Sequence, residues 1–246
     1  MRVGVWDERE KVWSTAEIED HNLFIEKSSK KRLDFTTRKL AQLAFLQSRC
    51  TDYPYKSWKL RCVENQKAIL DIETRRGLLL TFEIGPEYLT LLIEGHTAEG
   101  EEILPELKNL KNKPMQPGYL LLELSKCGIH LLPRDEDANL GEIKLKDFHA
   151  EERAIADIST AVRSFAVRSS KWNPSIDPEN IVVKIRENLE FDRDFFEDHE
   201  PDWKYFMWWS NKCAFVRTSE ATDDPTQPDT RIVNGHETHT IMSLAL

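Results

Sequence analysis

WKLRCVENQKAILDIETRRGLLLTFEIG, residues 58–85, has the clearest strand pattern in the chain. Apolar side chains alternate from Ala68 through Leu70 to Ile72, as expected for a strand with one buried face. After the turn-like ETRRG comes an apolar run at residues 78–82. With YLTLLIEG just downstream, the pattern predicts an antiparallel meander, because each strand is followed by a short turn.

Two segments after the meander have helical patterns. QPGYLLLELSKCG (116–128) places Pro117 in a first turn and Gly128 at a C-cap. HAEERAIADISTAVRSFAVRSS (149–170) repeats apolar residues at spacings of three and four, which predicts one helix ending by SKWNPS. Between the two, IHLLP (129–133) is predicted to be a short strand.

The chain then returns to strand patterns. NIVVKIRENLEF (180–191) is predicted to be a strand, with Ile181, Val183 and Ile185 on one face. WKYFMWWS and CAFVRTSE (213–220) follow as a hairpin with NK at its turn. The first of these strands has aromatic side chains on both faces. One face would be core, and the other would meet a second layer, another domain or a partner protein.

The first fifty residues also favour strands. Trp6 and Trp13 flank the charged DEREK, which predicts a hairpin with both rings on one face. Burial of one such ring is worth about 2–3 kcal/mol, so we expect Trp13→Ala to unfold or aggregate the protein. NLFIE and RLDFTT are further candidate strands, and KLAQLAFLQ (39–47) fits either a strand or a short helix.

These elements predict an α+β protein: a β-rich N-terminal layer, a partial β-sandwich, followed by an antiparallel sheet with two main helices packed on it. Residues 1–50 would be the β-layer and the end of a β-sandwich. Residues 51–220 would be the α+β domain, beginning at the turn-rich YPYKS. Residues 221–246, with TDDPTQPD, would be a linker and a truncated C-terminal segment.

Composition limits the classes of partner. The chain has 246 residues, is 40% hydrophobic and 31% charged, and has a formal net charge of −9. Surplus acid disfavours nucleic acid and anionic membranes as partners, since both attract Lys and Arg. MRVGVWDERE lacks the apolar core of a signal peptide, and the apolar runs are broken by Glu, Gly or Pro. We therefore expect an intracellular, soluble protein.

A search for catalytic and metal-binding motifs finds none. GxGxxG, Walker and GxSxG patterns are missing, and the four cysteines form no CxxC pair, so they are expected to be buried or half-buried thiols. NGHETHT offers His236, Glu237 and His239 without HExxH spacing. DRDFFEDHEPD (192–202) has six carboxylates but not the Gly of a calcium loop. We expect no catalytic residue, no cofactor-binding residue, no metal site and no cofactor.

The basic KSSKKR (27–32) has two interpretations: contact with an acidic surface such as a tubulin tail, or a solvated hairpin turn. The sequence leaves both open.

Four stretches, in order, resemble the C-terminal region of the cancer susceptibility candidate 1 family, also called axonemal dynein intermediate chain 7. They carry a W-D-x(5)-W strand pair, an F-x-F-like strand ending in a FAxLQ-like segment, a P-[FY]-x-S-W-x-L-R segment and an SKWN helix end. The matching stretches are VWDEREKVWSTAEIED (5–20), LDFTTRKLAQLAFLQSR (33–49), YPYKSWKLR (53–61) and SSKWN (169–173).

The resemblance implies a non-catalytic accessory or regulatory subunit of an axonemal inner-arm dynein. It would dock dynein intermediate chains and heavy chains and the tubulin of the doublet microtubule in motile cilia, with no nucleic acid and no membrane as partner. Its location would be the cytoplasm, the cytoskeleton and the ciliary axoneme. Family members extend beyond both ends of the matched region, so the chain is expected to be a fragment.

Two alternatives come from other classes of protein: a generic intracellular protein- or ligand-binding module, and an uncharacterised hydrolase or lyase. A hydrolase would need a cleft with a titratable pair of displaced pKa values. The first fifty residues also resemble the end of the autoproteolytic domains of adhesion receptors. Self-cleavage is excluded, because Leu40 is followed by Ala41, which has no nucleophilic atom, and Arg38 replaces the basic His.

Overall fold

The computed structural model describes residues 2–25, 31–64, 66–92, 105–141, 144–188, 203–209, 212–217 and 231–232. The chain divides into two units, residues 1–51 and 52–246. No helix in the described ranges has the length and apolar character needed to cross a bilayer. Residues 221–230 and 233–246, most of the predicted C-terminal linker, lie outside the described ranges.

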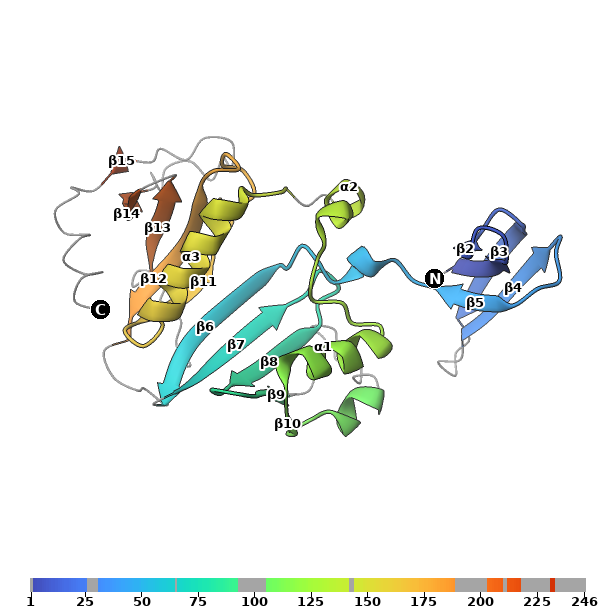
Figure 1. Ribbon diagram of the computed structural model, residues 1–246, viewed down its shortest axis with the longest axis horizontal. Helices are drawn as coiled ribbons and strands as arrows, with labels where there is room; N and C mark the ends of the chain where they lie inside the picture. The colour runs from blue at the N-terminus through green and yellow to red at the C-terminus, as the bar shows by residue number, and fades with distance from the viewer. Residues whose placement is uncertain are drawn as a thin grey trace. The chain divides into compact units, whose positions relative to one another are not determined.

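The first unit consists of short antiparallel strands (Figure 1). Three form a sheet in the order β2-β1-β5, and two form the separate hairpin β3-β4. Their bounds are β1 (Arg2–Asp7), β2 (Val12–Ser14), β3 (Ile18–Ile25), β4 (Lys31–Thr37) and β5 (Leu43–Leu46), followed by the 3-10 turn η1 (Arg49–Thr51). The assignment of this unit as the end of a larger β-sandwich stays a prediction.

The predicted tryptophan hairpin is confirmed. Trp6 lies directly opposite Trp13, with ring centroids 5.2 Å apart in an edge-on arrangement. Trp13 is nevertheless 40% exposed. The full burial assumed from sequence is therefore wrong, and Trp13→Ala should cost less than the about 2–3 kcal/mol of a fully buried ring. Within the segment 39–47, residues 43–46 form a strand and none forms a helix, because β5 pairs with β1 through Val3 and Phe45.

The second unit is built on one antiparallel sheet of ten strands, ordered β10-β9-β8-β7-β6-β11-β12-β13-β14-β15. The predicted meander is confirmed as β6 to β9, which pair in sequence order. Strand bounds are β6 (Ser57–Glu64), β7 (Lys67–Glu73), β8 (Leu79–Ile84), β9 (Leu89–Leu92), β10 (Pro114–Met115), β11 (Phe165–Ser169), β12 (Ile181–Glu187), β13 (Lys204–Trp209), β14 (Lys212–Arg217) and β15 (Arg231–Ile232).

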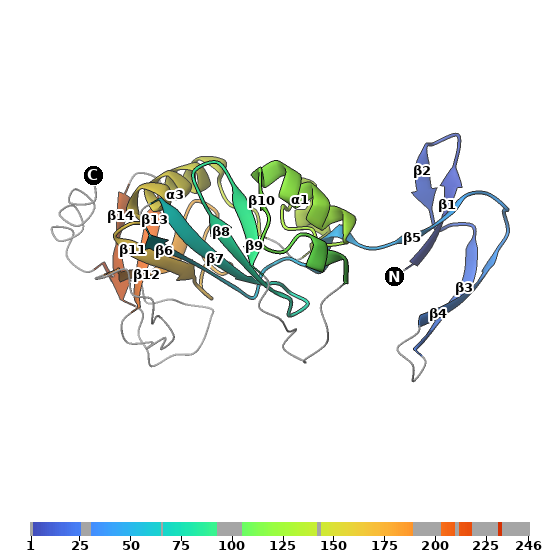
Figure 2. The same cartoon turned by 90° about the horizontal axis from the view of Figure 1, so that it is seen from below.

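Two main helices cover one side of this sheet, which confirms the predicted α+β class (Figures 1 and 2). Helix α1 (Pro117–Lys126) packs with β7, β8 and β9, and helix α3 (Phe148–Ala161) packs with β11, β12 and β13. Trp58 is half-buried and contacts both helix clusters. The shorter elements are α2 (Ala138–Gly141), η2 (Pro105–Asn109) and η3 (Asp135–Asp137).

Helix α1 begins and ends as its sequence predicts. Pro117 is its first residue, and Gly128, with φ of +78°, follows the Cys127 cap. Leu120 and Leu124, one turn apart, are both fully buried and hold the helix on the sheet. They are also the reason this helix forms here, because an isolated ten-residue helix is marginal in water.

The strand predicted at residues 129–133 is wrong. No residue of this segment joins a strand. Polar groups of its backbone form hydrogen bonds with side chains instead. The His130 N–H donates to Asp52, and the Tyr55 hydroxyl donates to the Leu131 carbonyl. These bonds replace a strand partner, which is how a buried irregular segment avoids unpaired polar groups.

The predicted helix over residues 149–170 is right for its first part and wrong for its end. Asp147 caps α3 by accepting from the Ala150 N–H at 2.9 Å, and the helix ends at Ala161. Residues 165–169 form strand β11 between β6 and β12. FAVRS has both helical and alternating character, and the sheet decides between them by supplying hydrogen-bond partners on two sides.

The aromatic strand β13 is core on both faces. Phe206 and Trp208 enter the cluster under α3. Met207 packs in a separate cluster on the opposite face with Trp172, Val182 and Val216. The second layer anticipated for this strand therefore comes from the same chain. The hairpin of β13 and β14 is confirmed, but Lys212, predicted to lie in its turn, is the first residue of β14 and pairs with Trp209. Asn211, the other predicted turn residue, lies outside the described residues.

Candidate functional site

The side of the large sheet opposite the two main helices is lined by charged residues. Alternation places apolar residues such as Leu60, Leu70 and Phe82 toward the helices, so their neighbours point the other way. We call this surface the charged face. Its half-buried members are Lys59 and Arg61 of β6, Asp71 and Glu73 of β7, Thr81 and Glu83 of β8, Arg168 of β11, and Lys184 and Arg186 of β12.

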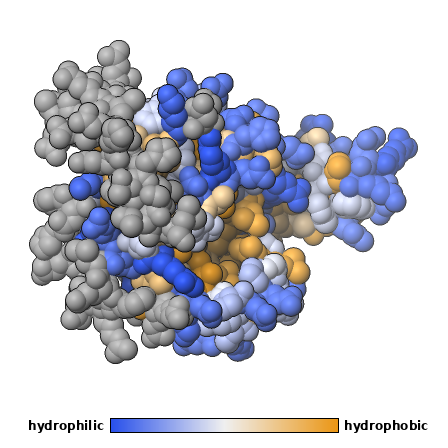
Figure 3. Space-filling model, turned by 60° about the vertical axis from the view of Figure 1, so that its left-hand side comes forward, coloured by the Kyte–Doolittle hydropathy of each residue, from blue (hydrophilic) through white to orange (hydrophobic). Residues whose placement is uncertain are grey.

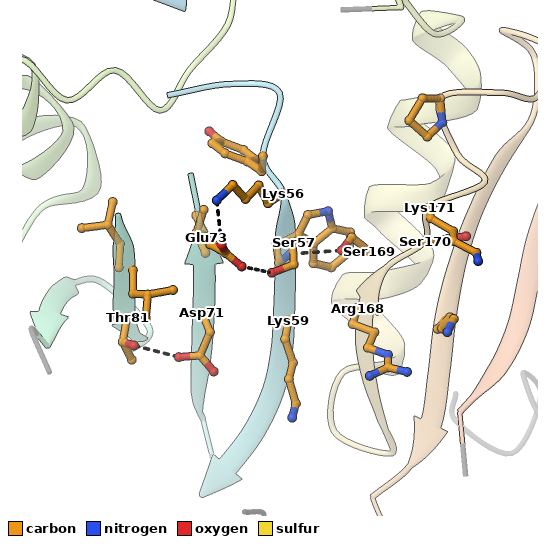
Figure 4. A pocket seen from close by; sticks show the side chains of 17 residues that line it. Lys56, Ser57, Lys59, Asp71, Glu73, Thr81, Arg168, Ser169, Ser170 and Lys171 are labelled. Carbon is orange, nitrogen blue, oxygen red and sulfur yellow. Dashed lines mark hydrogen bonds and ion pairs between the residues drawn. The ribbon is translucent and has the colours of Figure 1, made fainter. Parts of the chain in front are cut away.

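The charged face is hollowed. A hollow of about 680 Å³ runs over β6 to β8, β11 and β12, and residues 169–174 also contribute to its lining. Figure 4 shows Asp71, Lys59 and Arg168 on neighbouring strands along it. The helix-bearing side differs, because Figure 3 shows a hollow there in which hydrophobic residues gather.

The side chains of β7 supply two of the carboxylates of the charged face. Asp71 accepts a hydrogen bond from the Thr81 hydroxyl at 2.8 Å and lies 3.9 Å from the Arg61 guanidinium. Glu73 lies 3.2 Å from Lys56 Nζ, and the Ser57 hydroxyl donates to it at 3.4 Å. Ion pairs as exposed as these contribute about 0–1 kcal/mol each. They orient the two carboxylates more than they stabilise the fold.

Three cationic residues of the charged face lie directly opposite one another on adjacent strands. Lys59 of β6 is in register with Arg168 of β11, and Arg168 is in register with Lys184 of β12. Neighbouring strands lie about 4.8 Å apart, and like charges directly opposite one another destabilise a sheet. These three residues, which we call the cationic row, gather positive charge on one part of the sheet and are candidates for a binding role.

Trp203 is a common neighbour of these cations. Its ring centroid lies 4.3 Å from the Arg168 guanidinium carbon, 5.5 Å from that of Arg186 and 5.7 Å from Lys59 Nζ. The residue is 5% exposed. A cation over an indole gains about 0.5–2 kcal/mol, which offsets part of the repulsion within the row. The ring thereby holds Arg168 in place on the face.

Tyr55 marks the rim of the hollow. Burial, with a smaller contribution from the Asp52 charge, raises the pKa of its phenol to about 12. The hydroxyl donates to the Leu131 carbonyl. This phenol stays protonated at neutral pH, and its proton is already used in a hydrogen bond. Tyr55 is therefore a structural group and not a general base.

Most stretches singled out from the sequence lie outside the described residues. These are residues 27–30, 192–202 and 234–240, with His236, Glu237 and His239. Arg32, the last residue of the basic cluster, pairs with Asp34 at 2.8 Å. Within the described ranges, no group of three His, Cys, Asp or Glu side chains has the geometry to hold a metal ion.

The four cysteines are thiols, as expected. Cys50 and Cys62 are buried, and Cys127 and Cys213 are half-buried. Burial raises the pKa of the Cys213 thiol, with the nearby Asp157 carboxylate acting in the same direction. A raised pKa makes a thiol less nucleophilic at neutral pH.

Sequence reasoning missed the cationic row. One signal was available: if Ile181, Val183 and Ile185 point inward, then Lys184 and Arg186 of the same strand must point outward. The sequence could not show that Lys59 and Arg168 lie in register with Lys184. Residues 165–169 fit a helix, and the order of the strands was unknown.

Comparison with known proteins gives the following matches. The dynein axonemal intermediate chain 7 of Bos taurus is 25% identical over 224 residues, which cover 90% of this chain and 29% of that protein. The Danio rerio protein of the same name is 27% identical over 192 residues, 77% of this chain and 24% of the relative. The Homo sapiens protein is 22% identical over 219 residues, 89% of this chain and 29% of the relative.

No family model matches the chain. The chain spans between 24% and 29% of the length of these three relatives. The resemblance inferred from the four motifs is confirmed: this chain is similar, over most of its own length, to part of dynein axonemal intermediate chain 7.

Proposed function

We propose that this chain is part of a non-catalytic accessory subunit of an axonemal dynein, and that its charged face docks a protein partner. The observation that carries the proposal is the match over 90% of the chain to the dynein axonemal intermediate chain 7 of Bos taurus. A match of this extent covers both units and not a single motif. We therefore transfer the role suggested by that name to the fold as a whole.

The residues of the shared motifs support this proposal through their structural roles. Trp58 contacts both helix clusters, and Trp172 is 5% exposed within the cluster on the opposite face. Asn173 accepts a hydrogen bond from the Val182 N–H at 3.1 Å. The motif residues thus build and anchor the fold. A relative that keeps them would keep the sheet, and with it a surface of the same shape.

The finer proposal concerns the assembly. We infer that the subunit belongs to an inner dynein arm in the ciliary axoneme, where it contacts dynein intermediate chains and heavy chains and the doublet microtubule. A broad sheet face with charges of both signs suits docking, since charge complementarity steers partners and sets their register.

The test is retention on axonemes. A tagged full chain expressed in a ciliated cell should remain with detergent-extracted axonemes and leave them with inner-arm dynein at high salt, because contacts between exposed charges are screened. Affinity capture from that salt extract should recover dynein intermediate and heavy chains. A chain found wholly in the detergent-soluble fraction, without dynein, would refute the proposal.

A second candidate, a ligand-binding module, has one observation in its favour. The hollow of about 680 Å³ falls within the range of small-molecule sites, about 300–1,000 Å³. Native mass spectrometry of the purified chain tests it. A reproducible small-molecule adduct that is lost in the Thr81→Trp variant would favour a ligand-binding function. A spectrum that shows only the mass of the unbound chain would count against it.

A further inference from the structure

We propose that a groove between helices α1 and α3 binds an amphipathic α-helix of a partner protein, with its apolar stripe against the sheet and a basic residue at one end. The groove has Trp58 and Leu60 of β6 and Leu70 of β7 as its floor, and one wall is the side of α3 that faces β6. It lies on the opposite side of the sheet from the charged face. The inference therefore goes beyond the proposed function and does not depend on it.

The floor of the groove is apolar and only partly covered. Leu60 lies directly opposite Leu70 of β7 and Val167 of β11. Leu70 packs against the α1 cluster and Val167 belongs to the α3 cluster, but Leu60 is half-buried and belongs to none of the apolar clusters of the described residues. Figure 1 shows β6 and β7 between the two helices, and Figure 3 shows a hollow with hydrophobic residues on this side. The two main helices thus leave an apolar strip of their own sheet open.

The width of the groove suits a helix. Helix α1 packs over β7 to β9 and α3 over β11 to β13, so the middle strands beneath them, β8 and β12, are four places apart in the sheet. At about 4.8 Å for each place, the two helices lie about 19 Å apart. Helices that pack side by side lie about 8–10 Å apart, so the space admits one further helix. An added strand does not suit it, because β6 and β7 already have neighbours on both edges.

The side of α3 that faces the groove is apolar. Arg153 and Asp157 form hydrogen bonds with the two tryptophans of β13, so this side of the helix faces β13. With 3.6 residues for each turn, Ile155 lies on the other side of the helix, toward β6. Ile155 and Phe148, seven residues apart on that side, are each 67% exposed. Exposed apolar side chains beside a half-covered apolar floor are typical of a surface that a partner covers.

One end of the groove is acidic, which sets the charge of the partner. Burial, followed by the charge of Asp135 in η3, raises the pKa of the Glu151 carboxyl in the first turn of α3. Lys146 acts in the opposite direction, but its ammonium also donates to three backbone carbonyls of residues 176–180. The stretch 134–152 has seven acidic residues and three basic ones. A Lys or Arg of the partner would relieve the repulsion between the two carboxylates.

The same charge disfavours a second copy of the chain as the occupant. Each copy has a formal net charge of −9 and would bring the same acidic stretch to the groove. Like charges across an interface oppose association, whereas a helix with a basic end complements the groove.

The experiment measures the fluorescence anisotropy of a labelled helical peptide of about sixteen residues, titrated with the full chain. Such a helix is about 24 Å long, close to the length of the eight-residue strand β6. The probe has Leu at spacings of three and four, Lys in its last turn, and Ala and Gln elsewhere. One matched peptide has the same composition with its Leu residues spread around the helix. A second has Gln in place of Lys.

The apolar part of the groove is tested by a variant with Leu60→Thr and Ile155→Ser. Its control carries Val12→Thr and Phe45→Ser in the first unit, where Phe45 is also 67% exposed. We expect the groove variant to bind the probe at least about tenfold more weakly than the wild type, and the control to stay within about twofold. Circular dichroism must show both variants folded. If the groove variant is not, Ile155→Ser alone replaces it, with an expected loss of about fivefold against Phe45→Ser.

The acidic end is tested by Asp135→Asn with Glu151→Gln, and the control is Glu8→Gln with Glu10→Gln in the exposed turn of the first unit. The first pair should weaken binding of the Lys probe by about fivefold and leave binding of the Gln probe unchanged. The control should change neither. An equal loss for both probes would contradict the assigned contact between these carboxylates and the basic end of the partner.

Other results would overturn the inference as a whole. They are equal binding of the peptide with dispersed Leu residues, equal binding by the groove variant and its control, or no saturable binding of the probe. A dimer of the chain, seen by light scattering and lost in the groove variant but not in the control, would assign the groove to a second copy instead. None of these variants alters the charged face, so failure here leaves the proposed function standing.

Discussion

The helix-covered face of the ten-stranded sheet and the charged face are built from alternate residues of the same strands. On the helix-covered face, Leu80, Phe82 and Leu91 are at most 2% exposed and pack under α1. On the charged face, the charged and polar side chains are half-buried and form ion pairs, hydrogen bonds and cation–π contacts. Buried apolar residues on this side are concentrated near β13, where Val182 and Met207 pack with Trp172.

This difference between the two faces indicates which side chains of each strand stabilise the fold. Burial of apolar area drives folding, at about 25 cal/mol for each Å². Half-exposed ion pairs contribute little, since water and salt compete for the charges. Over strands β6 to β8, stability should therefore depend mainly on the helix-covered face and charge-mediated binding on the charged face, and paired substitutions on single strands can test that division.

The largest effect is expected from Phe82→Ala. The ring is 2% exposed in the α1 cluster, and a buried Phe→Ala change typically costs about 3–5 kcal/mol through lost burial and the cavity left behind. Thr81→Ala, the next residue on the same strand but on the charged face, should cost less than about 1 kcal/mol. Urea unfolding measures both. Equal losses in the free energy of unfolding for the two variants would contradict the proposed difference between the faces.

Asp52→Ala should rank second. Asp52 is fully buried, accepts from Arg76 Nε at 2.8 Å and accepts the His130 N–H at 3.0 Å. Removing one partner of a buried pair can cost about 3–5 kcal/mol, but Arg76 is 38% exposed and regains water, so about 2–3 kcal/mol is expected. Chemical denaturation should show this loss. Asp71→Ala, on the charged face, is the control, and a loss as large there would contradict the division.

Tyr55→Phe addresses the boundary between the two faces, because Tyr55 packs against the α1 cluster and lines the hollow. Loss of its hydrogen bond to Leu131 should cost about 1 kcal/mol at neutral pH. The pKa of the phenol, about 12 in the folded chain, exceeds its model value of 10.0. The unfolded chain therefore releases this proton first, and the folded state loses stability as pH rises from about 10 to about 12.

This pH dependence should be missing from the Phe variant. The measurement is the difference in free energy of unfolding between the wild type and Tyr55→Phe at pH 8 and at pH 11, since the subtraction removes the shared titration of lysines. A difference that does not shrink toward the higher pH would show that the phenol is not buried in the folded protein.

The smallest effect on stability is expected on the cationic row. Lys59 and Lys184 are half-buried on the charged face and belong to no apolar cluster, so replacing both by Gln should leave the free energy of unfolding within about 0.5 kcal/mol of the wild type. Thermal melting at low and high salt checks this. A loss greater than about 1 kcal/mol would mean that these cations stabilise the fold, and the charged face would then not be reserved for binding.

Local patterns were enough to predict much of the fold. The alternation at Ala68, Leu70 and Ile72 identified β7, and the start and end of α1 followed from Pro117 and Gly128. The pairing of Trp6 with Trp13 followed from a short charged turn. Each of these predictions depends on residues close together in the chain, whose preferences are set by backbone sterics and side-chain periodicity.

The errors and the site have a different origin. Residues 165–169 became a strand because β6 and β12 offered hydrogen bonds on both sides, and residues 129–133 stayed irregular because Asp52 and Tyr55 bind their backbone. The cationic row brings together Lys59 and Arg168, which are far apart in sequence. Amino-acid order alone specified most of the strands, both ends of α1 and the family resemblance. Folding in three dimensions decided which strands became neighbours, because register across a sheet is set by long-range pairing that local periodicity does not encode.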